Sequence, residues 1–186
     1  MFILMDSSKD VAPDIFEKQK ELVKAFVRSF AFSPKGPHGN VLIYAQFAYI
    51  VTDLSKSVRA IYNRIDSATL LGKPRRVDTA LQQTAALLSR SKHNGRKIVV
   101  LLIAGRHAPG TGSLAEAIKP LVRLRAQIFV VAIGQQLRKK DTRPIVDRPQ
   151  DVFSIKEPAS LLSSTGAIAK AIHDKPGIIR IKTTDT

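Results

Sequence analysis

The chain has 186 residues, of which 44% are hydrophobic, and this is enough to build one hydrophobic core in a single domain. The absence of cysteine excludes a small fold held together by disulfides, and no apolar run approaches the roughly 20 residues that span a membrane. The net charge of +15 predicts attraction to polyanions such as nucleic acid, glycosaminoglycan or an anionic surface, although a basic solvated surface gives the same composition.

The first predicted element is a buried strand that runs directly into a polar cluster. Four consecutive apolar residues, 2–5, suit a strand covered on both faces of a parallel sheet, and no signal-peptide pattern precedes them. The polar residues that follow fall at the carboxyl end of this strand, where open α/β sheets place their ligand sites. Asp6, Ser8 and Asp10 alternate, so their oxygens can converge on a divalent cation such as Mg²⁺. The alternative is a polar loop that merely caps the following helix.

The rest of the chain alternates between helical and strand-like segments. Apolar residues at helical spacing predict helices over residues 13–32, 57–65, 77–91, 113–125 and 158–172. Short apolar runs predict strands over residues 41–47, 48–52, 98–104, 127–133 and 152–155. This alternation predicts an α/β fold with a Rossmann-like, doubly wound, mainly parallel central sheet, helices on both faces and one antiparallel edge strand. We expect one domain over residues 1–172 and a flexible tail or linker over residues 173–186, where the apolar periodicity fades.

Four stretches of the sequence resemble the von Willebrand factor type A domain family. The first is the strand that ends in Asp6–Asp10, which is close to the family's D-x-S-x-S, and the second is the turn and second strand at Gly36–Phe47. The third is the start of the third helix at Arg76–Leu81, and the fourth is the apolar strand at Lys97–Gly105, which in the family ends in Thr-Asp-Gly. The resemblance covers residues 1–172, and extracellular-matrix members, such as those of collagen VI and the matrilins, look nearest. It therefore implies the family fold and a secreted matrix location.

The resemblance also implies a site for a divalent cation, called a metal-ion-dependent adhesion site. In the family, the ligands are the D-x-S-x-S residues, a Thr from a second loop and an Asp from a third, and the cation accepts a carboxylate from the partner protein. Asp6 and Ser8 match this pattern, whereas Asp10 stands where the second Ser would be. The Thr position falls near Arg75 and the Asp position falls on Ala104, so the resemblance implies a degenerate site.

The sequence leaves two interpretations of this degenerate site open. Loss of the Thr and Asp ligands weakens the binding of Mg²⁺ or another divalent cation, but Asp10 restores one carboxylate. In the other interpretation, Arg75 or Arg76 reaches the carboxylates of Asp6 and Asp10 and supplies the positive charge itself. A guanidinium suits this role because it can pair with carboxylates in a bidentate geometry.

Two basic clusters follow from the topology of a parallel sheet. Loops at the carboxyl edge bring together a top-face cluster suited to anions or a partner protein, which consists of Lys73, Arg75, Arg76, Arg106 and His107. Lys9 lies beside this cluster, and residues 138–143 add further cations. The opposite edge holds a second basic patch, which consists of Arg90, Lys92, Arg96 and Lys97. For each of these residues the alternative is a plain solvated surface.

The sequence contains no pattern that predicts an enzyme. It lacks a G-x-S-x-G nucleophile loop, a Walker loop and G-x-G-x-x-G, and none of its four histidines has metal-ligand spacing to another. The segment Gly110–Ser113 before a helix is compatible with anion binding or with a plain loop. Aromatic residues are too few to supply platforms for base stacking, which argues against specific recognition of single-stranded nucleic acid.

We therefore predict a non-catalytic interaction or adhesion module of a secreted extracellular-matrix protein. Its degenerate adhesion site and basic surface suit collagen or glycosaminoglycan as partners, and the only cofactor that the resemblance implies is Mg²⁺ or another divalent cation. The alternative is an intracellular domain of the same family in a nucleic-acid-associated complex. A remote third class is a hydrolase or nucleotide-binding enzyme of similar α/β layout.

Overall fold

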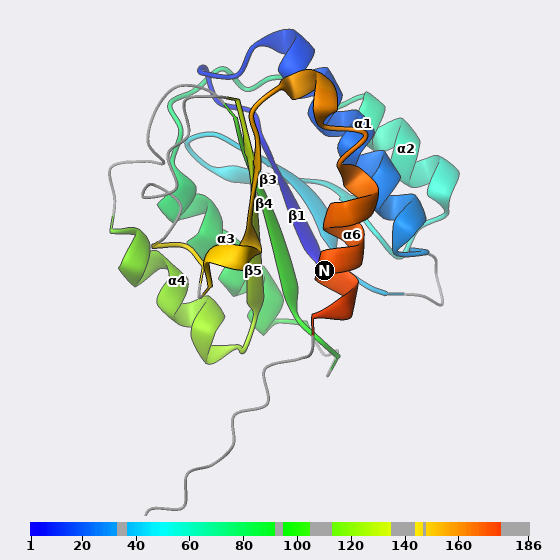
Figure 1. The fold of residues 1–186 in the computed structure, drawn as a ribbon. Helices are drawn as coiled ribbons and strands as arrows, with labels where there is room; N and C mark the ends of the chain where they lie inside the picture. Colours follow the sequence, from blue (N-terminus) through cyan, green and yellow to red (C-terminus); the bar gives the residue numbers. More distant parts are fainter. Residues whose placement is uncertain (33–36, 92–94, 105–112, 135–143, 147, 176–186) are drawn as a thin grey trace, which may run out of the picture.

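The computed structural model describes residues 1–32, 37–91, 95–104, 113–134, 144–146 and 148–175. These residues form a six-stranded sheet with the strand order β3-β2-β1-β4-β5-β6 (Figure 1). The strands are β1 (Phe2–Asp6), β2 (Asn40–Tyr44), β3 (Ala48–Asp53), β4 (Ile98–Ala104), β5 (Gln127–Ile133) and β6 (Val152–Ile155). Every neighbouring pair is parallel except β2 and β3, which are antiparallel. The predicted fold class, with one antiparallel edge strand, is confirmed.

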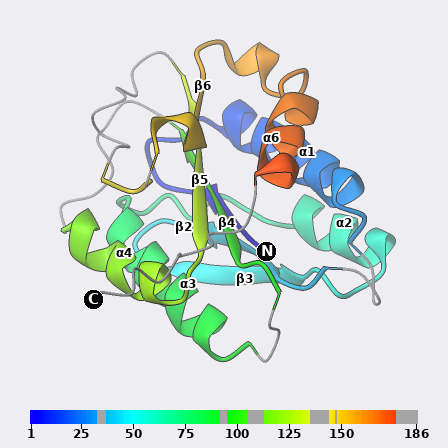
Figure 2. The same ribbon diagram turned by 60° about the horizontal axis from the view of Figure 1, so that its bottom comes forward.

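Helices cover both faces of the sheet. They are α1 (Pro13–Ser29), α2 (Val58–Asp66), α3 (Val77–Ser89), α4 (Leu114–Arg123) and α6 (Thr165–Asp174), with short 3₁₀ helices at Pro149–Asp151 and Pro158–Ser160. Helices α1, α2 and α6 pack on one face, and α3 and α4 pack on the other (Figures 1 and 2). None of the helices in the described ranges combines the length and apolar character needed to cross a membrane.

The central strands are continuously apolar because both of their faces are covered. All seven residues of β4 and all seven of β5 are buried. Alternate side chains of a strand point to opposite faces, so β4 feeds two separate cores: Val100 and Leu102 pack with α1, α2 and α6, whereas Val99 and Leu101 pack with α3 and α4. A run of this kind has no polar face, which is the pattern expected of a parallel sheet covered on both sides.

The topology sets the position of the polar loops. Strand β1 pairs with β2 on one side and with β4 on the other. The strand order therefore runs outward from β1 in both directions, through β2 to β3 and through β4 and β5 to β6. Ligand sites of doubly wound sheets lie at such a switch point, outside the carboxyl ends of the strands. Asp6 ends β1 and Ala104 ends β4, so the two residues meet at this edge.

The end of the chain differs from its prediction. The expected helix over residues 158–172 is divided into a 3₁₀ turn and α6, and α6 continues through His173 and Asp174. His173 and Asp174 therefore belong to α6, whereas residues 176–186, which make up most of the predicted tail, lie outside the described ranges. The helix continues past its apolar face because polar contacts hold it: Arg96 donates to the carbonyl oxygens of Ile172 and His173, and Lys175 pairs with Asp151.

Strand β3 forms an edge of the sheet with little protection. Its residues Tyr49 and Ile50 are each 52% exposed, and residues 41–52 contain no charged side chain. A register shift between Val41 and Leu42 interrupts its pairing with β2. Edge strands usually carry charged residues or proline that discourage pairing with another chain, and β3 has neither before Asp53.

Candidate ligand site at the carboxyl edge of the sheet

Asp6 is held in place by a glutamine of the first helix. Its backbone N–H donates to Gln19 Oε1 at 2.9 Å, and Gln19 Nε2 donates to the backbone oxygen of Asp6 at 3.0 Å. Both residues are 0% exposed. The pairing of β1 with β4 ends at Leu4, whereas that with β2 includes Asp6, so these two hydrogen bonds satisfy the backbone of Asp6 beyond the end of the β4 pairing and fix the direction in which its side chain leaves the sheet.

The carboxylate of Asp6 accepts hydrogen bonds from two loops and a guanidinium. Oδ1 accepts from the backbone N–H of Ser8 at 3.0 Å, and Oδ2 accepts from the backbone N–H of Ala104 at 3.0 Å. Arg75 Nε lies 2.9 Å from Oδ2. Burial raises the pKa of Asp6 above its ordinary value, and this shift is opposed first by the charge of Arg75 and then by hydrogen bonds from Ala104 and Ser8.

Ser7 holds the loop that precedes the third helix against the end of β1. Its hydroxyl donates to the carbonyl oxygen of Thr69 at 3.3 Å and accepts from the N–H of Leu71 at 2.8 Å. The N–H of Gly72 donates to the carbonyl oxygen of Ser7 at 3.1 Å. Gly72 has a φ of +62°, a left-handed conformation that favours glycine, so the loop can turn back across the edge of the sheet here.

Two further backbone hydrogen bonds aim Arg75 into the site. Before Arg75 in the chain, the carbonyl oxygen of Lys73 accepts from the N–H of Lys9 at 2.9 Å. After it, the N–H of Arg76 donates to the carbonyl oxygen of Ala45 at 2.9 Å. Arg75 therefore lies on a segment that is tied to β1 before it and to β2 after it. Its side chain is only 2% exposed.

The guanidinium of Arg75, which comes from the loop before α3, contacts both the loop that follows β1 and the end of β4. Besides Asp6, its Nε donates to Ser8 Oγ at 3.3 Å. Its Nη2 donates to the backbone oxygen of Ala104 and lies 4.0 Å from Asp10 Oδ2. Asp6, Ser8 and Asp10, which were predicted to converge on one point, surround this guanidinium.

Of the two arginines that the sequence left open, Arg75 is the one that contacts Asp6. Arg76 instead forms a two-bond pair with Asp78, in which Nε lies 2.9 Å from Oδ1 and Nη2 lies 2.7 Å from Oδ2. Among the other predicted top-face residues, Lys73 is exposed. Arg106 and His107 lie outside the described ranges.

The second basic patch at the opposite edge has members with different environments. Arg96 donates to Gln127 Oε1 at 2.6 Å and to the last carbonyl oxygens of α6 at 2.7 and 3.1 Å, so its guanidinium joins β5 to α6. Arg90 is exposed and Lys97 is half-buried. Lys92 lies outside the described ranges.

The sequence reasoning missed Gln19 and the role of Ser7. A faint signal was present for Gln19, because it falls on the same helical face as Phe16, Val23 and Phe26, all of which are buried. A polar residue in such a stripe indicates a buried hydrogen-bonding partner. Nothing local to Ser7 distinguished it from its neighbour Ser8, since its partners lie more than sixty residues away.

The fold and the site together define an α/β domain whose polar loops converge at the carboxyl edge of a doubly wound sheet. A family model of the von Willebrand factor type A domain matches residues 1–166. The chain therefore belongs to this family, and the predicted resemblance is confirmed.

The similar proteins include extracellular-matrix proteins. The collagen alpha-1(XXI) chain of Xenopus laevis is 22% identical over 156 residues, which cover 82% of this chain and 16% of that protein. The collagen alpha-1(VI) chain of Gallus gallus is 22% identical over 154 residues, which cover 78% and 15%. This chain thus spans about a sixth of the length of the two collagens.

Solved structures show the same fold. Proximal thread matrix protein 1 from the mussel byssus has a TM-score of 0.79 at 18% identity, over 90% of this chain and 46% of the mussel chain. Another structure of that protein has a TM-score of 0.78 and a zinc-occupied MIDAS motif. MIDAS is the abbreviation for metal-ion-dependent adhesion site. This chain is therefore a von Willebrand factor A domain that resembles those of extracellular-matrix proteins, which supports a role in interaction or adhesion.

Proposed function

We infer that this chain is a non-catalytic interaction module of a secreted extracellular-matrix protein, and that Arg75 takes the place of the divalent cation at its adhesion site. The observation that carries this proposal is the buried pair between Arg75 Nε and Asp6 Oδ2 at 2.9 Å. In the family, the cation is the positive charge that joins the three loops. Here the guanidinium comes from the second loop and contacts the first loop at Asp6 and Ser8 and the start of the third loop at Ala104.

The donor set around Asp6 does not fit a hard divalent cation. Such an ion takes six or more oxygen ligands and favours carboxylates. Both oxygens of Asp6 already accept N–H donors, and the third loop contributes an alanine at residue 104. In the described part of the chain, no three His, Asp or Glu side chains gather to hold a metal ion. A fixed guanidinium beside Asp6 also repels a second positive charge.

This arrangement changes how a partner would be recognised. A bound metal ion offers an open coordination position to one carboxylate of the partner, whereas the contacts of Arg75 are directed into its own domain and its side chain is 2% exposed. Recognition then depends on the surrounding surface, where Lys9 and Lys73 are exposed. With the net charge of +15, this surface suits anionic partners such as glycosaminoglycan or acidic stretches of matrix proteins such as collagen.

Thermal unfolding with and without metal tests the replacement of the cation. Millimolar Mg²⁺ or Mn²⁺ should leave the melting temperature of the wild-type chain unchanged, as should EDTA. The double variant Arg75→Thr/Ala104→Asp returns the Thr and Asp ligands of the family's pattern, with Asp10 still in place of the second Ser, and should be stabilised by the same ions, because binding to the folded state raises stability. Clear stabilisation of the wild-type chain by either ion would overturn the proposal.

Chromatography tests the partner class. We expect the chain to be retained on heparin and on immobilised collagen, with elution by salt and no effect of EDTA. Its affinity for heparin should exceed its affinity for duplex DNA. The two affinities are compared at the same ionic strength, because both ligands are polyanions and their binding depends on salt. Tighter binding to duplex DNA would favour the nucleic-acid-associated alternative instead.

A further inference from the structure

Strand β3 forms an open edge of the sheet, since no strand lies beyond it in the strand order (Figure 2). Three of the five large apolar side chains that are exposed in the described ranges fall here within four residues: Phe47, Tyr49 and Ile50 are 46%, 52% and 52% exposed. An inference about this edge uses none of the contacts of Arg75, so it is independent of the proposed function.

The backbone of Ile50 is directed outward from this edge. The carbonyl oxygen of Tyr44 accepts from the N–H of Ser7 at 2.8 Å, so the backbone groups of Tyr44 are directed toward β1. Because these groups alternate in direction along a strand, those of Ile43 are directed toward β3, and those of its register partner Tyr49 toward β2. The next residue, Ile50, therefore presents its N–H and C=O to the open side.

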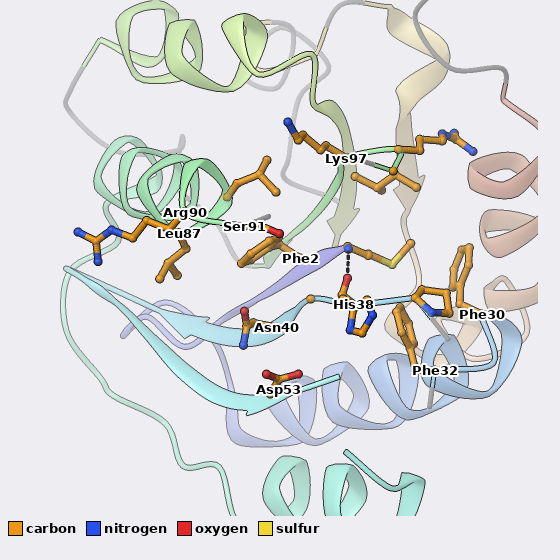
Figure 3. Close-up of a pocket in the computed structure, with 17 residues that line it drawn as sticks. Phe2, Phe30, Phe32, His38, Asn40, Asp53, Leu87, Arg90, Ser91 and Lys97 are labelled. Atoms are coloured by element: carbon orange, nitrogen blue, oxygen red, sulfur yellow. Dashed lines mark hydrogen bonds between the residues drawn. The ribbon is translucent and has the colours of Figure 1, made fainter. Parts of the chain in front are cut away.

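The two ends of the edge differ from its centre. At one end, Gln83 Oε1 accepts from the N–H of Ala48 at 2.6 Å, so α3 already covers that backbone group. Figure 3 shows Leu87 of the same helix projecting toward the β2–β3 hairpin, and Leu87 and Ala48 pack against the same core. At the other end, the register shift with β2 follows Ile50. The open part of the edge is therefore centred on Ile50.

The surface around Ile50 carries almost no charge. Residues 41–52 contain no charged side chain. Among the 13 residues of α3, only Asp78 is charged, and it is 5% exposed and paired with Arg76. Seven of the 17 residues of α1 are charged, by contrast. Residues 47–52 and the exposed residues Gln82 and Ala86 of α3 thus form a neutral edge on a chain whose net charge is +15.

This lack of charge favours a second copy of the chain as the occupant. A two-fold interface brings the same patch of both copies together, so an exposed cation within it meets its own counterpart and repels it. The neutral edge avoids that repulsion. An anionic partner gains nothing from a surface without cations, because the exposed lysines and arginines elsewhere on the chain attract it instead.

We propose that two copies of this chain associate through β3 as an antiparallel pair, with Ile50 of each copy at the two-fold axis. The axis is perpendicular to the sheet, so the two sheets become continuous and the α3 helices lie on the same face. The two Ile50 residues exchange N–H···O=C hydrogen bonds. Their side chains meet on the α3 face, because Ile50 pairs with Leu42, which packs in the core beneath α3.

Sedimentation equilibrium of the whole chain at physiological ionic strength tests the stoichiometry. The mean mass should rise with protein concentration from one copy toward two and stop there, because a two-fold interface closes on itself. A chain that stays monomeric up to about 1 mM would assign the edge to a strand of another protein and overturn the proposal. Growth of the mass beyond two copies would overturn it as well.

Chemical cross-linking tests the position of the interface. The chain has no cysteine, so Ile50→Cys and Val58→Cys each carry a single thiol. Both positions are exposed, at 52% and 41%, and Val58 begins α2. A short bismaleimide should join copies of Ile50→Cys at least about tenfold faster, because directly opposite residues of such a pair lie about 5.5 Å apart. Equal rates would show random collision and overturn the assignment to β3.

Hydrogen exchange of the wild-type chain tests the register without a substitution. Exchange of the Ile50 amide should slow by about tenfold between the dilute monomer and the concentration at which nine-tenths of the chain is dimeric, because only the monomer leaves this group open. The Tyr49 amide, which is directed toward β2, serves as the control and should change little. Dimer formation without protection of the Ile50 amide would contradict the proposed pairing.

Discussion

Arg75 and Asp6 depend on each other because both charges are removed from water. Their side chains are 2% and 0% exposed. Burial of an unpaired charge is costly, whereas a pair with further hydrogen bonds is tolerated. The N–H groups of Ser8 and Ala104 supply those hydrogen bonds to Asp6. The pair is therefore a requirement for this loop arrangement more than a source of net stability.

Substitution of Arg75 should expose this dependence. Arg75→Met keeps an unbranched apolar stem but leaves the Asp6 carboxylate buried without its cation, and we expect a loss of about 3–5 kcal/mol in the free energy of unfolding. Lys73→Met removes the same charge from an exposed position two residues away and should change stability by less than about 0.5 kcal/mol. Urea denaturation at neutral pH measures both. Similar losses in the two variants would argue against a buried charge pair.

The deficit of Arg75→Met should depend on pH. The charge of Arg75 is the largest of the effects that lower the pKa of Asp6 against the effect of burial. Without it, the pKa of Asp6 in the folded variant rises further above its ordinary value of 3.8. Between 3.8 and the raised pKa, the folded state holds a proton that the unfolded state has released, so stability falls as pH rises through this window. The gap between wild type and variant should be largest at neutral pH and shrink toward about pH 4 in urea denaturation. A gap independent of pH would contradict this assignment.

At the scale of elements, Gln19 is the contact that joins α1 to the end of β1. Its amide side chain satisfies the backbone N–H and the backbone oxygen of Asp6, which would otherwise be buried without partners. This connection transmits the position of α1 directly to the Asp6 carboxylate, because the hydrogen-bonded backbone groups belong to Asp6 itself.

Gln19→Leu should preserve the volume of the side chain and remove both hydrogen bonds. We expect a loss of about 2–4 kcal/mol, since an unsatisfied buried polar group costs about 1–3 kcal/mol. Hydrogen exchange of the Asp6 amide should accelerate beyond the global change. Arg28→Ala, at an exposed position of the same helix, serves as the control for helix propensity. Unchanged protection of the Asp6 amide in Gln19→Leu would contradict the proposed coupling.

Most of the fold was predictable from the sequence because its signals are local. The apolar run of seven residues in β4 and the run of six that follows Gln127 in β5 are typical of buried strands, and helical spacing identified the faces of α1 and α3. The end of α6 was not predictable, because its last residues are held by Arg96, which lies 76 residues earlier in the chain than Ile172. Periodicity does not register a contact of that kind.

The candidate site was predictable in part. The pattern at Asp6–Asp10 and the parallel topology placed the three loops together, and the resemblance to the family drew attention to Arg75 and Ala104. The choice between Arg75 and Arg76 required the structure, because adjacent residues point in different directions.

At the scale of the whole molecule, net charge and the exposed edge of β3 oppose each other. The charge of +15 keeps copies apart when it is poorly screened, whereas Tyr49 and Ile50 leave an apolar edge open to another strand. Electrostatic repulsion acts over a Debye length of about 30 Å at 10 mM salt but only about 8 Å at physiological ionic strength. The balance therefore shifts toward association as salt increases.

Sedimentation or light scattering across a salt series should detect this shift. We expect the mean mass of the wild-type chain to rise with ionic strength, and Ile50→Lys to prevent the rise by placing a charge on the edge strand. Val58→Lys adds the same charge at an exposed apolar position on α2, which is 41% exposed, and should leave the rise in place. Dissociation with increasing salt, or equal behaviour of the two variants, would contradict the role of β3.

The contact of Arg75 with both Asp6 and Ala104 has an evolutionary consequence under the proposed function. Codons for Thr and Arg can differ by a single base, as can those for Ala and Asp. Two single-base substitutions can therefore replace the Thr and Asp ligands of a bound metal ion by Arg75 and Ala104. Their order matters, because removing Arg75 first would leave Asp6 buried without a counter-charge. Reversion to a metal site is therefore expected to begin with Ala104→Asp. The new carboxylate would lie beside the guanidinium of Arg75, which already contacts residue 104.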